Sequence, residues 1–136
     1  MSARSMLLLV FLITGPLVTT SPLMAQETVT PLISKELAGA SGKDVLIYTV
    51  DFPPGYSSPV HRHDAQLFLY VLEGSIVTQV KGGKEITLTP GQIFFEDPND
   101  IHTVSRNASS TQPAKFLVFM VKKKGAPPLV LEKGPL

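Results

Sequence analysis

The chain has 136 residues, of which 43% are hydrophobic and 17% are charged, and its formal net charge at pH 7 is +1. This length and balance are typical of one globular domain and exclude a disordered chain. The sequence has no basic stripe or long charge run, so nucleic acid and anionic membrane surfaces are not expected partners. Because it contains no cysteine, disulfides and thiolate metal ligands are excluded as well.

The amino terminus has the features of a secretory signal peptide covering residues 1–25. Arg4 supplies a positive charge, residues 7–18 are mostly apolar, and Ala25 is a small residue at the expected cleavage position. The alternative is a membrane anchor, but a glycine and a proline interrupt the apolar stretch, which is shorter than the ~20 residues a spanning helix needs. We therefore expect a secreted or periplasmic protein that is not inserted in a membrane after cleavage.

The rest of the chain alternates short apolar runs with turn residues, a pattern that predicts an all-β fold. Prolines, glycines, asparagines and aspartates separate the runs. Eight short strands of this kind indicate a small sandwich or barrel. In chain order, the predicted strands are residues 45–52, 60–63, 67–73, 76–80, 84–88, 92–96, 102–105 and 115–121.

Two of these runs, residues 67–72 and 115–121, are apolar on both faces instead of alternating. In a sheet with one face in water, that face should be polar. A single small barrel covers only one face of each strand, so the other face needs a second layer or a second subunit. This pattern predicts a homodimer.

The chain has only three histidines, and their positions suit a single metal ion. His61 and His63 are two residues apart on a predicted strand, so their side chains point to the same face. His102 lies on a predicted strand that is distant in the sequence, and it would supply the third ligand. Neutral imidazole is a good ligand for zinc, copper, iron and nickel.

The spacing around the first two histidines resembles the first conserved motif of the cupin superfamily. Gly55, His61, His63 and Gly74 match that motif, Gly-x5-His-x-His-x3,4-Glu-x6-Gly, while Leu67 stands where the motif has a glutamate. One such motif is weak, but two together are specific.

A second segment is similar to the second cupin motif in a slightly shifted form. Pro98 precedes His102 by four residues instead of five, and Asn107 follows it by five instead of four. The resemblance implies a double-stranded β-helix, or jelly-roll barrel, over residues 45–121. Residues 26–44 would then form an N-terminal arm and residues 122–136 a C-terminal tail.

The resemblance implies that His61, His63 and His102 bind one divalent transition-metal ion, which could be Zn, Mn, Fe, Cu or Ni. Because Leu67 cannot bind a metal, three alternatives are open: a three-histidine site, a site in which Gln66 supplies a side-chain oxygen, or a site that has lost its metal. Three-histidine cupin sites occur among thiol dioxygenases and β-diketone-cleaving dioxygenases. The nearest candidates to accept the outer N–H groups of the histidines are Asp64, Asp100 and Gln66. The alternative for Asp64 and Asp100 is that they form turns.

Two classes of function follow from this expected site. As an enzyme, the protein would be a metal-dependent oxygenase or isomerase acting on a small organic molecule. As a non-catalytic module, the same pocket would bind a small molecule or a metal without turnover. Leu67, Leu69 and Val71 share a face that would line the pocket. Candidates for a polar contact with the ligand are Tyr48, Tyr56 and Gln79, and the sequence does not single out any of them.

Overall fold

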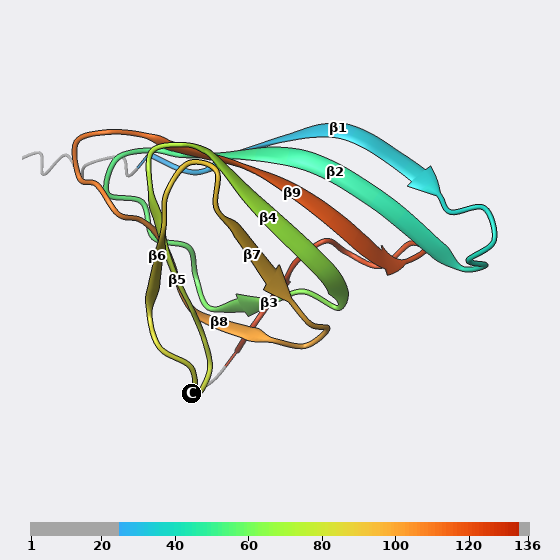
Figure 1. Cartoon of the computed structure of the whole chain (residues 1–136). Helices are drawn as coiled ribbons and strands as arrows, with labels where there is room; N and C mark the ends of the chain where they lie inside the picture. The colour runs from blue at the N-terminus through green and yellow to red at the C-terminus, as the bar shows by residue number, and fades with distance from the viewer. Residues whose placement is uncertain (1–24, 134–136) are drawn as a thin grey trace, which may run out of the picture.

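The computed structural model describes residues 25–133, which form an all-β structure of ten strands (Figure 1). Within this range, no helix is long and apolar enough to cross a membrane. The predicted signal peptide falls on residues 1–25, of which only the last lies inside the described range. Export therefore stays a prediction.

The strands form two antiparallel five-stranded sheets that close around the core as a jelly-roll barrel, which confirms the predicted fold (Figure 1). The first sheet has the order β1 (Thr28–Glu36), β2 (Lys43–Phe52), β9 (Ala114–Lys123), β4 (Ala65–Glu73) and β7 (Ile93–Glu96). The second has the order β10 (Val130–Leu131), β3 (His61–Arg62), β8 (Ile101–Asn107), β5 (Ile76–Val80) and β6 (Ile86–Leu88).

All eight predicted strands are present, but two further strands lie in the segments predicted as arm and tail. Strand β1 pairs along nearly its whole length with β2, and β10 pairs with β3, which carries His61. Both are edge strands. Every residue of β1 is exposed and β10 has only two residues, so neither shows the apolar alternation from which strands are recognised.

The core lies between the two sheets and is formed by alternate residues of the longer strands. In β4, Leu67, Leu69 and Val71 are buried, whereas Phe68 and Tyr70 on the opposite face are exposed. Burying three large aliphatic side chains on one strand contributes roughly 1.5–3 kcal/mol for each. Strand β4 is therefore apolar on both faces, as its sequence indicates, and only one face is covered by the barrel.

The outer face of the first sheet presents a cluster of aromatic rings. Phe68 is 43% exposed and lies directly opposite both Phe95 on β7 and Phe119 on β9. The ring centroids of Phe68 and Phe95 are 5.0 Å apart, within the range of a favourable aromatic pair. This exposed face is the one on which the homodimer prediction rests. Homodimer formation through this face stays a prediction.

Two residues of the predicted motifs have structural roles away from the histidines. Gly74 adopts a φ of +66° after β4, and a Cβ at this position would lie 2.4 Å from the carbonyl oxygen of Pro113. The amide of Asn107 donates to the carbonyl oxygens of Phe52, Pro53 and Gln112, and thereby ties the end of β2 to the loop before β9. These positions serve the closure of the barrel.

Candidate metal centre

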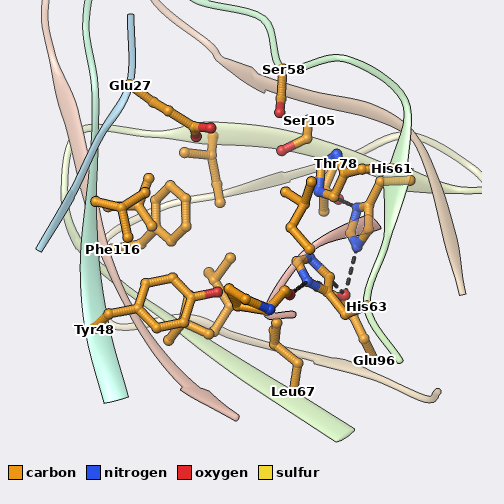
Figure 2. A pocket seen from close by; sticks show the side chains of 18 of the residues that line it. Glu27, Tyr48, Ser58, His61, His63, Leu67, Thr78, Glu96, Ser105 and Phe116 are labelled. Carbon is orange, nitrogen blue, oxygen red and sulfur yellow. Dashed lines mark hydrogen bonds and ion pairs between the residues drawn. The ribbon is translucent and has the colours of Figure 1, made fainter. Parts of the chain in front are cut away.

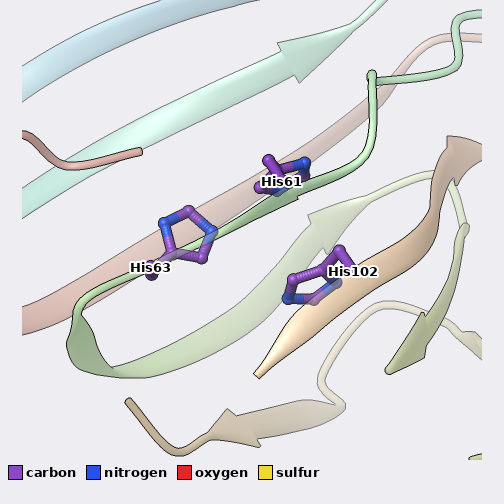
Figure 3. A group of neighbouring side chains, drawn as sticks. All are labelled: His61, His63 and His102. Carbon is purple, nitrogen blue, oxygen red and sulfur yellow. The ribbon is translucent and has the colours of Figure 1, made fainter. Parts of the chain in front are cut away.

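The three histidines converge inside the barrel, as their spacing predicts (Figure 3). His61 lies on β3 directly opposite His102 on β8, and the two rings stack with centroids 5.0 Å apart. His63 follows β3 by one residue and points to the same side as His61. All three side chains are buried, and one ligand atom from each lies within 4.8 Å of the others.

Hydrogen bonds orient the rings with their free nitrogens toward one another. Nδ1 of His61 lies 2.7 Å from the carbonyl oxygen of Pro59, and Nδ1 of His63 lies 2.6 Å from that of Pro128. Since a carbonyl oxygen only accepts, both Nδ1 atoms carry the proton and both Nε2 atoms keep a free lone pair. Outer hydrogen bonds of this kind hold metal-binding histidines in their tautomer and orientation.

The third ring is held by a side chain, because Nδ1 of His102 lies 3.1 Å from the hydroxyl oxygen of Thr78. The predicted outer partners were therefore wrong. Asp64 pairs with Arg62, and Asp100 accepts a hydrogen bond from the backbone N–H of Asp97 in a turn. The outer hydrogen-bond partners of the histidines are instead two backbone carbonyls and a threonine hydroxyl. The sequence does not identify them, because these contacts depend on how the strands pack.

Burial keeps two of the rings in the neutral form that metals bind. Burial, together with repulsion from the nearby His63 and His102, lowers the pKa of His61 to about 4. Burial likewise lowers the pKa of His63. At pH 7 both imidazoles are therefore uncharged and available as ligands without competition from protons.

A buried carboxylate that the spacing of the histidines did not reveal completes the cluster (Figure 2). Glu96, at the end of β7, is 2% exposed, and its Oε2 lies 2.6 Å from Nε2 of His102 and 4.0 Å from Nε2 of His63. Among the described residues, neither Glu96 Oε2 nor His102 Nε2 has a partner with hydrogen-bond geometry. A buried carboxylate oxygen without such a partner is costly unless a cation neutralises it.

The register of the sheet explains why this glutamate replaces the one expected from the motif. Leu67 on β4 and Glu96 on β7 are directly opposite each other, so the carboxylate comes from the neighbouring strand. Gln66 does not join the cluster, since its side chain is exposed on the outer face of β4. The structure therefore favours Glu96 over Gln66 as the fourth ligand. Nothing in the sequence of the predicted strand 92–96 distinguishes this inward-facing glutamate from an exposed one.

The four side chains suit a divalent transition metal in type and arrangement. Zinc binds histidine nitrogen at about 2.0–2.1 Å and carboxylate oxygen at about 2.0–2.2 Å, which places neighbouring ligand atoms roughly 3 Å apart. The 2.6 Å between Glu96 and His102 is near this value. The separations between the histidine ligand atoms, which are at most 4.8 Å, would shorten by up to about 2 Å on metal binding. A simple ion pair of Glu96 with a protonated His102 would explain this contact but not the convergence of His61 and His63.

The centre forms one wall of a cavity of about 190 Å³ inside the barrel. Leu67 and Leu69 line it, as predicted, together with Val50 and Val118. Val71, the third residue predicted on this face, is buried but does not line the cavity. Tyr48 lines it as well, and burial, reinforced by the carboxylates of Glu96 and Glu27, raises the pKa of its hydroxyl. The tyrosine therefore stays protonated at neutral pH and can donate a hydrogen bond within an apolar pocket.

A family profile described as cupin domain matches residues 48–120. The chain belongs to the cupin family. This match covers more than half of the chain, from within β2 to within β9, and includes the three histidines and Glu96, but not β1 or β10. No curated protein sequence matches the chain significantly.

Solved structures with the same fold include several cupins. The DMSP lyase DddQ of Ruegeria pomeroyi is 24% identical, with a TM-score of 0.64 over 84% of this cupin and 55% of the lyase. A cupin-like protein of Thermotoga maritima is 22% identical, with a TM-score of 0.63 over 78% of this chain and 75% of its own. A Thermus thermophilus protein is 28% identical, with a TM-score of 0.55 over 71% of this chain and 84% of its own. The cupin thus spans about half the length of the lyase.

Proposed function

We propose that this cupin is a metal-dependent enzyme that binds one divalent transition-metal ion through His61, His63, His102 and Glu96. Its substrate is a small organic anion that enters the adjoining cavity. The observation that supports this most strongly is the buried Glu96 carboxylate. Its Oε2 has no partner with hydrogen-bond geometry among residues 25–133 and lies close to His63 and His102, two of the three converging histidines. Neutral imidazoles together with one carboxylate are a ligand set for Zn, Mn, Fe, Cu or Ni, rather than for Mg or Ca, which prefer oxygen.

The charge of the ligand set favours an anionic substrate. Two neutral imidazoles, His61 and His63, contribute no charge at pH 7, and Glu96 cancels half of a double positive charge. The loaded site would keep a net positive charge at the wall of an apolar cavity, where electrostatic attraction is stronger than in water. A bound divalent ion would supply Lewis-acid chemistry by polarising a carboxylate or carbonyl oxygen of the substrate.

The remaining residues of the cavity bind the substrate and exclude water. Tyr48 keeps its proton at neutral pH and is placed to donate a hydrogen bond to an oxygen of a bound anion. Leu67, Leu69 and Val118 supply an apolar wall with no polar group to compete for that oxygen. These features favour a lyase or isomerase-type reaction, in which a polarised oxygen stabilises negative charge. The fold shared with a DMSP lyase adds that compound to the substrates to be tested.

The test begins with metal. Protein stripped by a chelator would be reloaded with each of the five metals, and we expect one equivalent to bind and to raise the melting temperature. Loaded protein would then be assayed with DMSP and a panel of small carboxylates, thiols and diketones, while oxygen uptake is followed in parallel. Turnover that His61→Ala abolishes and Gln66→Ala preserves would support the proposal.

The other results of this assay separate the competing functions. Oxygen consumption coupled to turnover would identify an oxygenase instead of a lyase or isomerase. Ligand-dependent thermal shifts without turnover across the panel would favour a non-catalytic binding module. Failure to take up any of the five metals would contradict the proposal, and the Glu96–His102 contact would then be an ion pair only.

Export is part of the same proposal. The positive charge at Arg4, the apolar residues 7–18 and the small Ala25 support cleavage by a signal peptidase and a location outside the cytosol. The metal would then be acquired after transport. Cell fractionation followed by mass spectrometry of the mature amino terminus checks this, and a cytosolic protein that retains Met1 would contradict it.

A further inference from the structure

A second carboxylate, Glu27, lines the cavity on the side opposite the histidines (Figure 2). Glu27 directly precedes β1, and the pairing of Thr28 with Asp51 carries it to the end of β2, beside Phe52. Its side chain is half-buried and points into the pocket. The cavity therefore has two polar ends, the candidate metal centre and Glu27, with an apolar middle.

Aromatic rings surround the Glu27 end. Phe52 packs against Tyr56 with ring centroids 4.8 Å apart and against Phe116 with centroids 4.9 Å apart, and Phe52 and Phe116 line the cavity. Burial raises the pKa of Glu27, and the nearby hydroxyl of Tyr56 offsets part of this rise. Ser58 and Ser105 lie nearby and add two hydroxyl groups to this end (Figure 2).

No basic side chain neutralises Glu27 within the pocket. The described residues that line the cavity include neither lysine nor arginine, and none of the ion pairs among them involves Glu27. A half-buried carboxylate among aromatic rings is complementary to a cation, because both the carboxylate and the ring faces attract positive charge. This end of the cavity therefore favours a cationic group over an anionic or apolar one.

We infer that the cavity binds a small zwitterion, with its carboxylate at the metal centre and an onium group between Glu27 and the rings of Phe52 and Phe116. The carboxylate end rests on the proposed function, whereas the onium end rests on Glu27 and its surroundings. The cavity, at about 190 Å³, is smaller than the roughly 300–1,000 Å³ of sites for drug-sized ligands, so the ligand is compact. The positive charge of the loaded centre and the negative charge of Glu27 fix its orientation.

The experiment uses pairs of ligands that differ only in charge. Trimethylammonio-carboxylates with one, two or three methylene groups would be compared with their all-carbon isosteres, of which 3,3-dimethylbutanoate is the first, by calorimetry on zinc-loaded protein. For the best-fitting chain length, we expect the zwitterion to bind about tenfold more tightly than its isostere, which corresponds to one cation contact partly shielded from water. The variant Glu27→Gln should remove this preference, so that the zwitterion and its isostere bind about equally. Glu85→Gln, which changes an exposed carboxylate outside the cavity, should preserve the preference.

The outcomes separate this inference from the proposed function. If zwitterion and isostere bind equally well, or if the preference survives in Glu27→Gln, the inference is overturned while the metal centre stands. If zinc loads but no ligand of either kind binds, the inference is overturned as well. If zinc does not load, the proposed function fails, and a preference for the zwitterion that still depends on Glu27 would support the onium end alone.

Discussion

Replacing Glu96 by glutamine tests the role of the buried carboxylate directly, because the change removes the charge and keeps the shape. Removing a group that only supports a metal ligand typically costs 10–100-fold in metal affinity. Glu96 reaches into the centre itself, with Oε2 2.6 Å from Nε2 of His102, so we expect the upper end of that range or more. The expected loss is about 100-fold, or ~2.7 kcal/mol.

The same variant separates a metal ligand from a structural ion pair. In the metal-free protein the glutamine amide can donate to the lone pair of His102, so the free energy of unfolding should change by about 1 kcal/mol or less. If Glu96 instead neutralised a protonated histidine, its loss would cost about 3–5 kcal/mol without metal and leave metal uptake unchanged. Competition titration with a chromophoric chelator and urea unfolding measure the two quantities. Gln66→Ala is the control, since its exposed side chain should affect neither.

A double variant, Leu67→Glu with Glu96→Leu, extends this test. The two side chains face each other across β4 and β7, so the exchange returns the carboxylate to the position of the family motif. We expect the metal affinity to recover to within about tenfold of the wild type, because both positions point into the same centre. Affinity as low as that of Glu96→Gln would show that the register argument is wrong.

Three further predictions concern stability and assembly. Gly74→Ala should lower the free energy of unfolding in urea by about 3 kcal/mol or more, because its Cβ would lie 2.4 Å from a backbone oxygen. The control is Gly82→Ala, which also has positive φ but has nothing within 4 Å of the added Cβ. It should cost only about 1–2 kcal/mol. In the metal-free protein, the pKa of His61 is lower in the folded state than in the unfolded chain, so on acidification the unfolded chain is protonated at His61 before the folded protein is. The free energy of unfolding should therefore be highest above about pH 6.5 and fall toward pH 4, and a flat profile would contradict this. Light scattering at micromolar concentration should give the mass of a dimer that Phe68→Lys or Phe95→Lys converts to monomer, and a monomeric wild type would rule out the apolar outer face as an interface.

The sequence predicted most of the fold because the central strands carry their own signal. Strand β4 has apolar side chains at every second position toward the core, and the turns that bound it contain residues with special backbone geometry, such as Gly74. Strand β1 was not predicted, for the opposite reason. It is exposed along its whole length and is held by pairing with β2 rather than by burial, so its sequence has no periodic pattern to detect.

The candidate site divides in the same way. A period of two places His61 and His63 on one face of a strand, and the second motif identifies His102, so these three candidate ligands are visible in the sequence. Glu96 and Glu27 are not. Each becomes a neighbour of the cavity only through cross-strand pairing. For Glu96 this is the pairing of β7 with β4, and for Glu27 it is the pairing of the consecutive strands β1 and β2.

The sequence by itself determined an all-β barrel with three inward-facing histidines, because local periodicity and turn chemistry are properties of consecutive residues. Only the tertiary structure decided which carboxylate completes the centre, which groups orient the rings, and what charge lies across the cavity. The physical reason is that cross-strand register and burial arise from contacts between distant segments. A glutamate in a short strand has the same sequence signature whether it faces water or a metal site.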